Sequence, residues 1–136
     1  MNAKQWLSRA RFIDREIAML QKTKEETRDN LTKITQSYES DGAQTTKDPH
    51  KYDRLVELEN EIDQKVDELI ATKREILNVI FKVEDRNQRQ VLISYYIRMK
   101  TLEKIAVEMN YSFRQIGNIR RYGIREVQKI IGYKMS

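Results

Sequence analysis

The fold is decided by residues 101–128, which read TLEKIAVEMNYSFRQIGNIRRYGIREVQ. Thr101 is suited to cap a helix, and Asn110 and Tyr111 interrupt the pattern that follows it. The apolar side chains that recur at helical spacing between them are Leu102, Ile105, Ala106 and Met109. Ser112, with Gln115 three residues later, has the form of a capping box and starts a second helix. The stretch therefore predicts two helices joined by a tight turn.

The second predicted helix has two opposite faces. Its apolar face comprises Ile116, Ile119, Gly123, Val127 and Ile130. Its front face comprises Arg114, Asn118, Arg121 and Arg125. Arginine can bond guanine bidentately, asparagine can bond adenine, and further arginines can hold phosphates. Such a helix could also be an ordinary charged surface helix, but the preceding helix, the turn and the single sign of charge favour a helix that enters a DNA groove.

Position along this helix divides the expected roles of the front face. Arg114 and Asn118, in the first turns, are expected to touch bases. Arg121 and Arg125, one and two turns later, are expected to reach phosphates. Gln115 lies at the side of the face and is expected to help where the helix enters the groove.

Charge is distributed unevenly along the chain. The net charge is +5 over 136 residues. Residues 1–85 carry 15 Lys and Arg against 18 Asp and Glu, whereas residues 86–136 carry 11 against 3, a net charge of +8. The C-terminal part is therefore the expected partner of a polyanion.

Two long heptad patterns precede this basic part. The first helix is expected from residue 2, capped by Asn2 with Gln5, to about residue 38. Its apolar positions are Trp6, Ala10, Ile13, Ile17, Leu20, Leu31, Ile34 and Tyr38, with Lys24 and Thr27 filling the two steps between Leu20 and Leu31. A polar loop over residues 39–47 follows, with Asp41 and Gly42 as turn residues.

The second long helix is expected to begin at Asp48 and Pro49 and to run to about residue 83. Its seam comprises Tyr52, Leu55, Ile62, Val66, Leu69, Ile76, Ile80 and Val83, with Glu59 and Lys73 as polar exceptions. Folding back at the loop gives an antiparallel, coiled-coil-like hairpin over residues 1–85. The register then pairs Tyr38 with Tyr52, Ile34 with Leu55, Leu20 with Leu69, Ile13 with Ile76, and Trp6 with Val83. The same heptads could instead pair between two chains.

A thinner apolar stripe of Val56, Ile70 and Leu77 runs beside the seam. A two-helix hairpin would leave it wet, so it is expected either to widen the core, to pack on the C-terminal domain or to contact a second subunit. Asp85 with Gln88 predicts one more capped helix, to about residue 99. Its expected core residues are Val91, Leu92, Tyr95 and Tyr96. This helix would complete a three-helix domain over residues 86–136.

The sequence favours a protein that is not an enzyme. It has no Cys and a single histidine, His50, beside a proline at a helix start, so we expect no metal site, cofactor or catalytic residue. No apolar run is long enough to span a membrane, and no signal-peptide pattern follows Met1. These features suit the cytoplasm.

Residues 89–130 resemble the helix-turn-helix of the fourth conserved region of bacterial sigma factors. The resemblance rests on the TLEKIA start, the short turn at residues 109–111, Ser112 as cap, Ile116 with Ile119, and a small residue at Gly123. With the long hairpin and the LISYYI run, the whole chain resembles phage-encoded late-gene transcription activators of the RinA/ArpU kind.

The resemblance implies that the start of the second helix reads promoter DNA. By position, the base-reading residues would be Phe113, Arg114, Gly117 and Asn118, with Ser112 at the cap. Phe113 and Gly117 stand where the sigma pattern has arginine, which implies an operator different from the housekeeping element. The other sigma regions have no counterpart, so the chain is not a complete sigma factor.

The sequence thus predicts an all-α, sequence-specific DNA-binding transcription regulator, with residues 1–85 as an oligomerisation or partner arm and residues 86–136 as the DNA-binding domain. Double-stranded DNA is the expected partner, host RNA polymerase a candidate partner and a homo-oligomer a candidate state, in the cytoplasm of the host if the gene is carried by a phage. Two alternatives remain open. One is a DNA-packaging adaptor of the small-terminase kind, and the other is a polymerase-binding interaction module that does not contact DNA.

Overall fold

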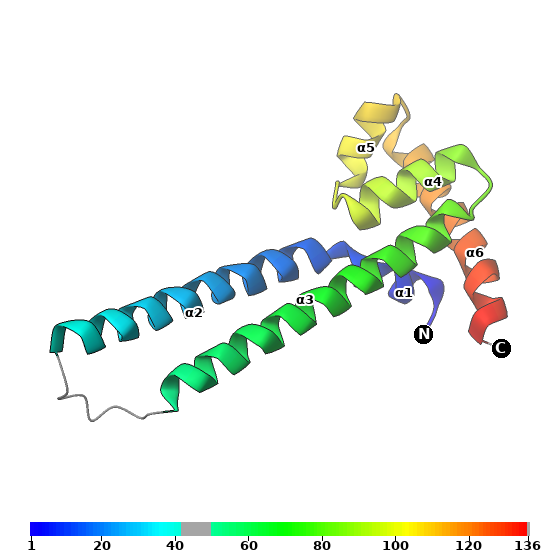
Figure 1. The fold of residues 1–136 in the computed structure, drawn as a ribbon. Helices are drawn as coiled ribbons and strands as arrows, with labels where there is room; N and C mark the ends of the chain where they lie inside the picture. Colours follow the sequence, from blue (N-terminus) through cyan, green and yellow to red (C-terminus); the bar gives the residue numbers. More distant parts are fainter. Residues whose placement is uncertain (42–49, 136) are drawn as a thin grey trace. The chain divides into compact units, whose positions relative to one another are not determined.

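The structure, a computed structural model, describes residues 1–41 and 50–135, with residue 31 and residues 34–41 and 133–135 described by backbone only. The described residues form helices and no strand, which confirms the all-α prediction. The elements are α1 (Ala3–Arg11), α2 (Ile13–Asp41), α3 (Lys51–Phe81), α4 (Arg86–Leu92), the π-helix η2 (Ile93–Ile97), α5 (Leu102–Met109) and α6 (Phe113–Met135) (Figure 1). No helix within the described ranges combines the length and apolar character needed to cross a membrane.

The chain divides into two compact units that do not follow the boundary expected at residue 85. Residues 1–14 and 70–136 make up the first unit, and residues 15–69 make up the second. The first unit contains the basic helices, together with α1 and the last part of α3.

The first predicted helix is interrupted at Phe12, which separates α1 from α2 and has φ −110° and ψ 5°. The heptad used Trp6 and Ala10 but omitted Ala3 and Leu7. All four of these side chains are buried, because α1 packs in the core of the first unit. The heptad spacing continues through Phe12 and therefore predicted one unbroken helix. The buried side chains of α1 form a separate stripe that does not follow this heptad.

The core of the first unit has two clusters of buried side chains. The larger comprises Ala3, Trp6, Leu7, Ala10, Ile76, Val79, Ile80, Val83, Leu92, Tyr96, Ile97, Val127 and Ile131. The smaller comprises Val91, Ile105, Ala106 and Ile116. Tyr95 packs against both, so α4, η2, α5 and α6 are tied together with α1 and α3.

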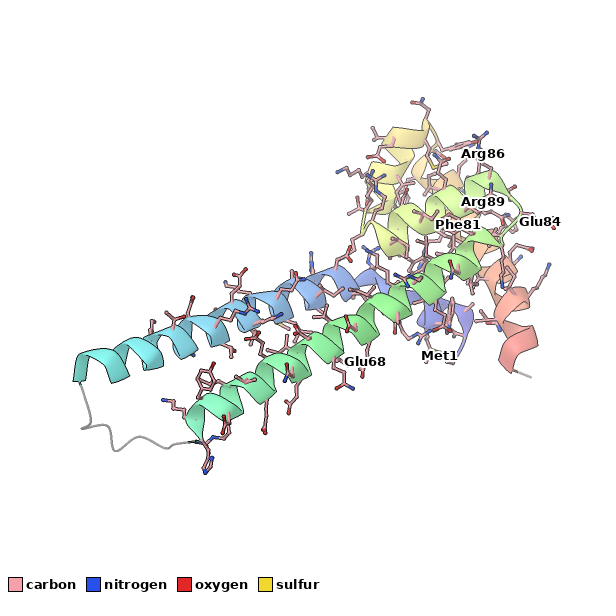
Figure 2. All side chains as sticks on the ribbon, in the orientation of Figure 1. Met1, Glu68, Phe81, Glu84, Arg86 and Arg89 are labelled. Atoms are coloured by element: carbon pink, nitrogen blue, oxygen red, sulfur yellow. The ribbon has the colours of Figure 1, made fainter. Side chains whose placement is uncertain are left out.

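The turn between α3 and α4 is held by a side chain from α4. Arg89 donates from Nη1 to the backbone carbonyls of Val83 and Glu84, over 2.7 and 2.8 Å (Figure 2). Asp85 caps α4 as predicted, because its carboxylate accepts a hydrogen bond from the Gln88 backbone over 2.9 Å. The reciprocal half of the predicted capping box is not made, and Gln88 Oε1 is buried without a partner among the described residues.

The predicted third helix was expected to run to about Met99, but its second half is a π-helix. The Arg98 backbone N–H donates to the Ile93 carbonyl, five residues back, over 2.9 Å. The wider turn buries Tyr96 and Ile97 in the larger cluster while Tyr95 remains half-buried. The π-helix ends at Ile97, and Met99, two residues later, has a φ of 57°, in the left-handed region.

In the second unit, α2 and α3 lie side by side (Figure 1). Lys24 Nζ lies 2.7 Å from Asp63 Oδ1, and Arg28 Nη2 lies 2.9 Å from Glu59 Oε1. Thr27 and Ile62 are buried, at 4% and 5% exposure. Of the polar positions in the predicted seam, Lys24 and Glu59 thus form ion pairs between α2 and α3, and Thr27 is buried.

Several other details of the long helices differ from prediction or lie outside the description. Tyr52, expected on the seam, is 53% exposed in the first turn of α3. Leu77 packs against the larger cluster, whereas Val56 and Ile70 of the thinner stripe are exposed. The helix α2 continues to Asp41, beyond the predicted end at residue 38. The predicted start at Asp48 and Pro49, and the side chains of Ile34 and Tyr38 in the predicted register, lie outside the described residues.

Candidate nucleic-acid interface

The turn between α5 and α6 is fixed by side-chain and backbone hydrogen bonds. Thr101 Oγ1 accepts from the Lys104 N–H over 3.2 Å and caps α5, as predicted. Asn110 ends the helix with φ 58° and ψ 39°, a left-handed conformation that asparagine tolerates better than most residues. The predicted capping box then starts α6, since the Gln115 N–H donates to Ser112 Oγ over 3.1 Å and the Ser112 N–H donates to Gln115 Oε1 over 2.8 Å. These bonds set the direction in which α6 leaves the turn.

The predicted apolar back of α6 faces the core. Ile116 and Val127 are fully buried, and Ile119 and Ile130 are half-buried. Gly123 is also buried, and a Cβ there would lie 3.1 Å from Leu92 Cδ1 and 3.2 Å from Leu92 Cγ. The absence of a side chain at Gly123 is therefore explained by close packing of α6 on α4.

The predicted front of α6 faces outward. Ser112, Phe113, Arg114, Gln115, Arg121 and Arg125 are exposed, and Gly117 and Asn118 are half-buried. Within the described part of the chain, Arg114 and Arg121 have no ion-pair or hydrogen-bond partner. Arg125 lies over the Tyr122 ring, 5.5 Å from its centroid. Exposed arginine side chains without internal ion-pair partners among the described residues are available to an anion from outside.

Gly117 lies on this front and has no packing explanation. A Cβ at Gly117 would meet nothing within 4 Å. Glycine inside a helix costs about 0.5–1 kcal/mol relative to alanine, so the position carries a cost that the fold does not require. Gly132 is open as well, but it lies in the last turn of α6, where a helix is readily frayed. Gly117 leaves room for something to approach the backbone of α6.

A pocket of about 350 Å³ extends this surface toward α1. It is lined by Lys4, Gly117, Arg120, Arg121, Ile124 and Arg125. Four of the six lining residues are cations, and none of the six carries a carboxylate. The sequence prediction included Gly117, Arg121 and Arg125 but missed Lys4 and Arg120. Lys4 gave no signal, because its position near α6 follows from the docking of α1.

Arg120 belongs to a cluster of two arginines and two tyrosines behind this surface. Its Nη2 donates to the Tyr96 hydroxyl over 3.0 Å, and its guanidinium carbon lies 4.5 Å from the centre of the Tyr95 ring. Arg11 of α1 lies 3.8 Å over the Tyr95 ring and donates from Nη1 to the Tyr95 carbonyl over 2.7 Å. Burial raises the pKa of the Tyr96 hydroxyl above its usual value of 10, and the Arg120 charge opposes that shift. The cluster joins α1, η2 and α6, and it positions Arg120 rather than leaving it exposed.

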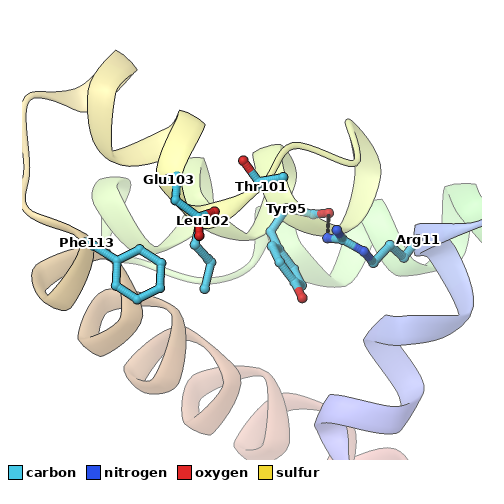
Figure 3. A pocket seen from close by; sticks show the side chains of 6 residues that line it. All are labelled: Arg11, Tyr95, Thr101, Leu102, Glu103 and Phe113. Carbon is cyan, nitrogen blue, oxygen red and sulfur yellow. Dashed lines mark hydrogen bonds between the residues drawn. The ribbon is translucent and has the colours of Figure 1, made fainter.

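Phe113 lies in a different place from the front cations. It lines a second pocket, of about 220 Å³, with Arg11, Tyr95, Thr101, Leu102 and Glu103 (Figure 3). Its side chain is nevertheless 54% exposed. Of the predicted site residues, the structure thus brings Gly117, Arg121 and Arg125 together and places Phe113 beside α5.

An ion pair links the segment that precedes α5 to the end of this helix. Lys100 Nζ donates to both carboxylate oxygens of Glu108, over 2.9 and 2.7 Å. This hydrogen bond, with the charge of Lys100, holds the pKa of the Glu108 carboxyl below its usual value of 4.5. A lowered pKa means that the pair stabilises the folded state above pH 4.5 and that this contribution is lost as pH falls through the folded-state pKa.

We therefore expect Glu108→Gln to lower the Tm at pH 7 and to have progressively less effect between about pH 6 and pH 3. Thermal unfolding of both proteins, followed by circular dichroism over this range, measures the difference. A difference in Tm that stays constant with pH would contradict the assigned role of the carboxylate.

Comparison with known proteins gives one finding and two negative results. No curated protein matches the chain, and no solved structure matches it. One family model matches residues 32–128, a range that covers the last third of α2, the whole of α3, α4, η2 and α5, and about two thirds of α6. The chain belongs to this family, which is described as "Protein of unknown function (DUF1492)".

Proposed function

We propose that this protein is a sequence-specific DNA-binding transcription regulator that acts in phage or prophage late-gene control. In this proposal α5 and α6 form a helix-turn-helix whose second helix enters the major groove, and α4 with η2 packs beside them in the first unit. The sigma-like resemblance of residues 89–130 is the basis for the transcriptional role. DNA is the proposed partner, and host RNA polymerase is a candidate second partner.

One observation carries the proposal, which is the combination of features on the outer face of α6. Arg114, Arg121 and Arg125 are exposed on the same face as Asn118, and the back of the helix is buried. Gly117 stands between them with open space above its backbone. Cations supply attraction to phosphates, Arg and Asn supply bidentate contacts to bases, and a missing side chain permits close approach.

The proposal predicts opposite effects of Gly117→Ala on folding and on binding. The added Cβ would lie in open space and would clash with nothing. The free energy of unfolding should therefore rise by about 0.5–1 kcal/mol, because alanine favours the helix more than glycine does. If the backbone of α6 approaches DNA at this position, the same methyl group should weaken duplex binding roughly tenfold, comparable to the loss of one base contact. Urea unfolding and fluorescence anisotropy with labelled duplex measure the two quantities.

Gly132→Ala is the matched control, because it also adds a Cβ into open space on α6 but lies outside the pocket. It should leave DNA binding unchanged. If Gly117→Ala binds duplex as tightly as wild type, this face of α6 does not approach DNA closely. A chain that shows no salt-dependent duplex binding at all would favour the protein-only alternative, and a ring of many subunits would favour the packaging adaptor.

We further propose that α2 and α3 form an antiparallel hairpin that serves as a partner or oligomerisation arm. The ion pairs support this arrangement, because the residue numbers increase from Lys24 to Arg28 along α2 while those of their partners decrease from Asp63 to Glu59 along α3. The exposed Tyr52, Val56 and Leu58 provide apolar surface for a partner of such an arm.

The hairpin can be tested by cross-linking, since the chain contains no native cysteine. The side chains of Lys24 and Asp63 converge to 2.7 Å, so Lys24→Cys with Asp63→Cys should be joined within one chain by a short bifunctional maleimide. The product should migrate as a monomer on a denaturing gel. Covalent dimers as the main product would show that the heptads pair between chains, and each single-cysteine variant serves as a control.

A further inference from the structure

The pocket between α1 and α6 has the composition of an anion site that includes the N-terminal segment of the chain. Lys4 comes from α1, whereas Gly117, Arg121 and Arg125 come from the front of α6. The two helices are joined beside the pocket, because the Ala3 backbone N–H donates to Gln128 Oε1 over 2.8 Å. The capping box of Asn2 and Gln5 fixes the start of α1, and buried Trp6 and Leu7 anchor the helix to the core.

The docked helix α1 fixes the backbone position of Lys4, but the packing of this helix does not involve the Lys4 side chain. Its side chain is exposed, and it has no ion-pair partner within the described residues. Three other lysines of the first unit do form ion pairs, since Lys73 pairs with Asp14, Lys100 with Glu108 and Lys129 with Glu126, whereas the described Lys82 and Lys104 resemble Lys4 in having none. A cation that is carried by a docked helix, in a pocket lined by further arginines and by no carboxylate, is suited to bind an anion from solution.

Geometry along α6 indicates which part of a duplex this anion would belong to. At about 1.5 Å of rise per residue, Arg121 and Arg125 lie roughly 10 and 16 Å beyond Arg114 along the helix. The major groove is about 12 Å wide. If Arg114 reads bases within the groove, the pocket with Arg121, Arg125 and Lys4 lies at its edge, where the sugar-phosphate backbone runs.

We infer that this pocket binds a phosphodiester of the DNA backbone, and that Lys4 carries the N-terminal helix α1 into the DNA-binding surface. The inference rests on the proposed function and extends it. The DNA-binding surface is then formed by residues from both ends of the chain. The phosphate contact would fix the register of α6 on the duplex without reading its sequence.

The test compares full-length wild type, Lys4→Ala, Lys4→Arg and Lys22→Ala, where Lys22 is an exposed lysine on α2. Binding to a selected duplex and to a random duplex is titrated by anisotropy across a salt series. We expect Lys4→Ala to weaken both complexes alike, roughly fivefold at about 0.1 M salt, and to reduce the slope of log K against log salt by about one. Lys4→Arg should keep the slope, and Lys22→Ala should behave as wild type.

Other results separate this inference from the proposed function. If wild type binds duplex but Lys4→Ala binds with unchanged affinity and salt slope, the inference is wrong and the proposed function stands. If wild type shows no salt-dependent duplex binding, the proposed function itself fails. Calorimetry with inorganic phosphate distinguishes a free anion from a backbone phosphate, because tight phosphate binding that Lys4→Ala abolishes, with duplex binding intact, would overturn the assignment to DNA.

Discussion

Trp6→Ala should destabilise the unit that contains the basic helices by about 3–5 kcal/mol, although Trp6 is separated from α6 by more than 100 residues in sequence. The indole is 5% exposed and belongs to the same buried cluster as Leu92, Tyr96, Val127 and Ile131. Removing it leaves a cavity among side chains from α1, α3, η2 and α6. The loss should therefore appear throughout the unit.

Chemical unfolding followed by circular dichroism measures the total effect, and hydrogen exchange of α6 amides shows whether it reaches the proposed recognition helix. Phe81→Ala is the control, because Phe81 is an aromatic residue of the same unit (labelled in Figure 2) that is 58% exposed. It should cost no more than about 0.5 kcal/mol. Equal effects of the two substitutions, or normal α6 protection in Trp6→Ala, would contradict the shared core.

The same core predicts that residues 86–136 do not fold cooperatively when isolated. Eight of the thirteen side chains of the larger cluster come from residues 3–83, including Leu7, Ile76 and Ile80. A fragment without them keeps the smaller cluster but loses most of the larger one, and small domains have little stability to spare.

Arg114→Ala and Asn118→Ala should each cost about 1–3 kcal/mol of binding free energy on the specific duplex and relax preference at one base position. Both residues lie in the first turns of α6, where a recognition helix comes closest to base edges, and Arg114 has no internal partner among the described residues. Arg125→Ala, near the middle of the helix, should instead weaken specific and random duplexes alike and lower the salt slope by about one.

Titration of the three variants on both duplexes across a salt series separates these two kinds of contact. Lys22→Ala is the control, because it changes charge without touching the described core. Gln128→Ala would not serve, because Gln128 accepts a hydrogen bond from the Ala3 N–H of α1. If Arg114→Ala and Asn118→Ala lose specific and random binding equally, the first turns of α6 contact phosphates and do not read sequence.

The local features of the C-terminal helices could be predicted from sequence because they depend on short-range chemistry. Caps at Thr101 and Ser112 require only a side-chain oxygen at the right spacing, and the structure confirms both. The apolar back of α6 follows from periodicity alone, and Ile116 and Val127 are fully buried. The outward-facing front follows as the opposite side of the same helix.

What sequence reasoning missed depends on tertiary contacts. The break at Phe12 arises because α1 docks on α6 and η2, and a heptad can be continued through such a position. The π-helix over residues 93–97 keeps the composition of an ordinary helix, so its wider turn gives no signal in the pattern. Lys4 lines the pocket with α6, and Arg11 lies over Tyr95 of η2, only because α1 docks on these two elements. Neither residue could therefore be predicted as a site residue from the sequence.

Selection of bound sequences from a random duplex pool tests the central claim most directly. The full chain and the Arg114→Ala, Asn118→Ala double variant are each taken through several rounds, and enriched sequences are compared. The account predicts that wild type enriches a defined motif, with binding that weakens as salt rises, and that the double variant loses this enrichment while keeping nonspecific affinity. No enriched motif with wild type, or the same motif with the double variant, would contradict the claim that α6 reads DNA.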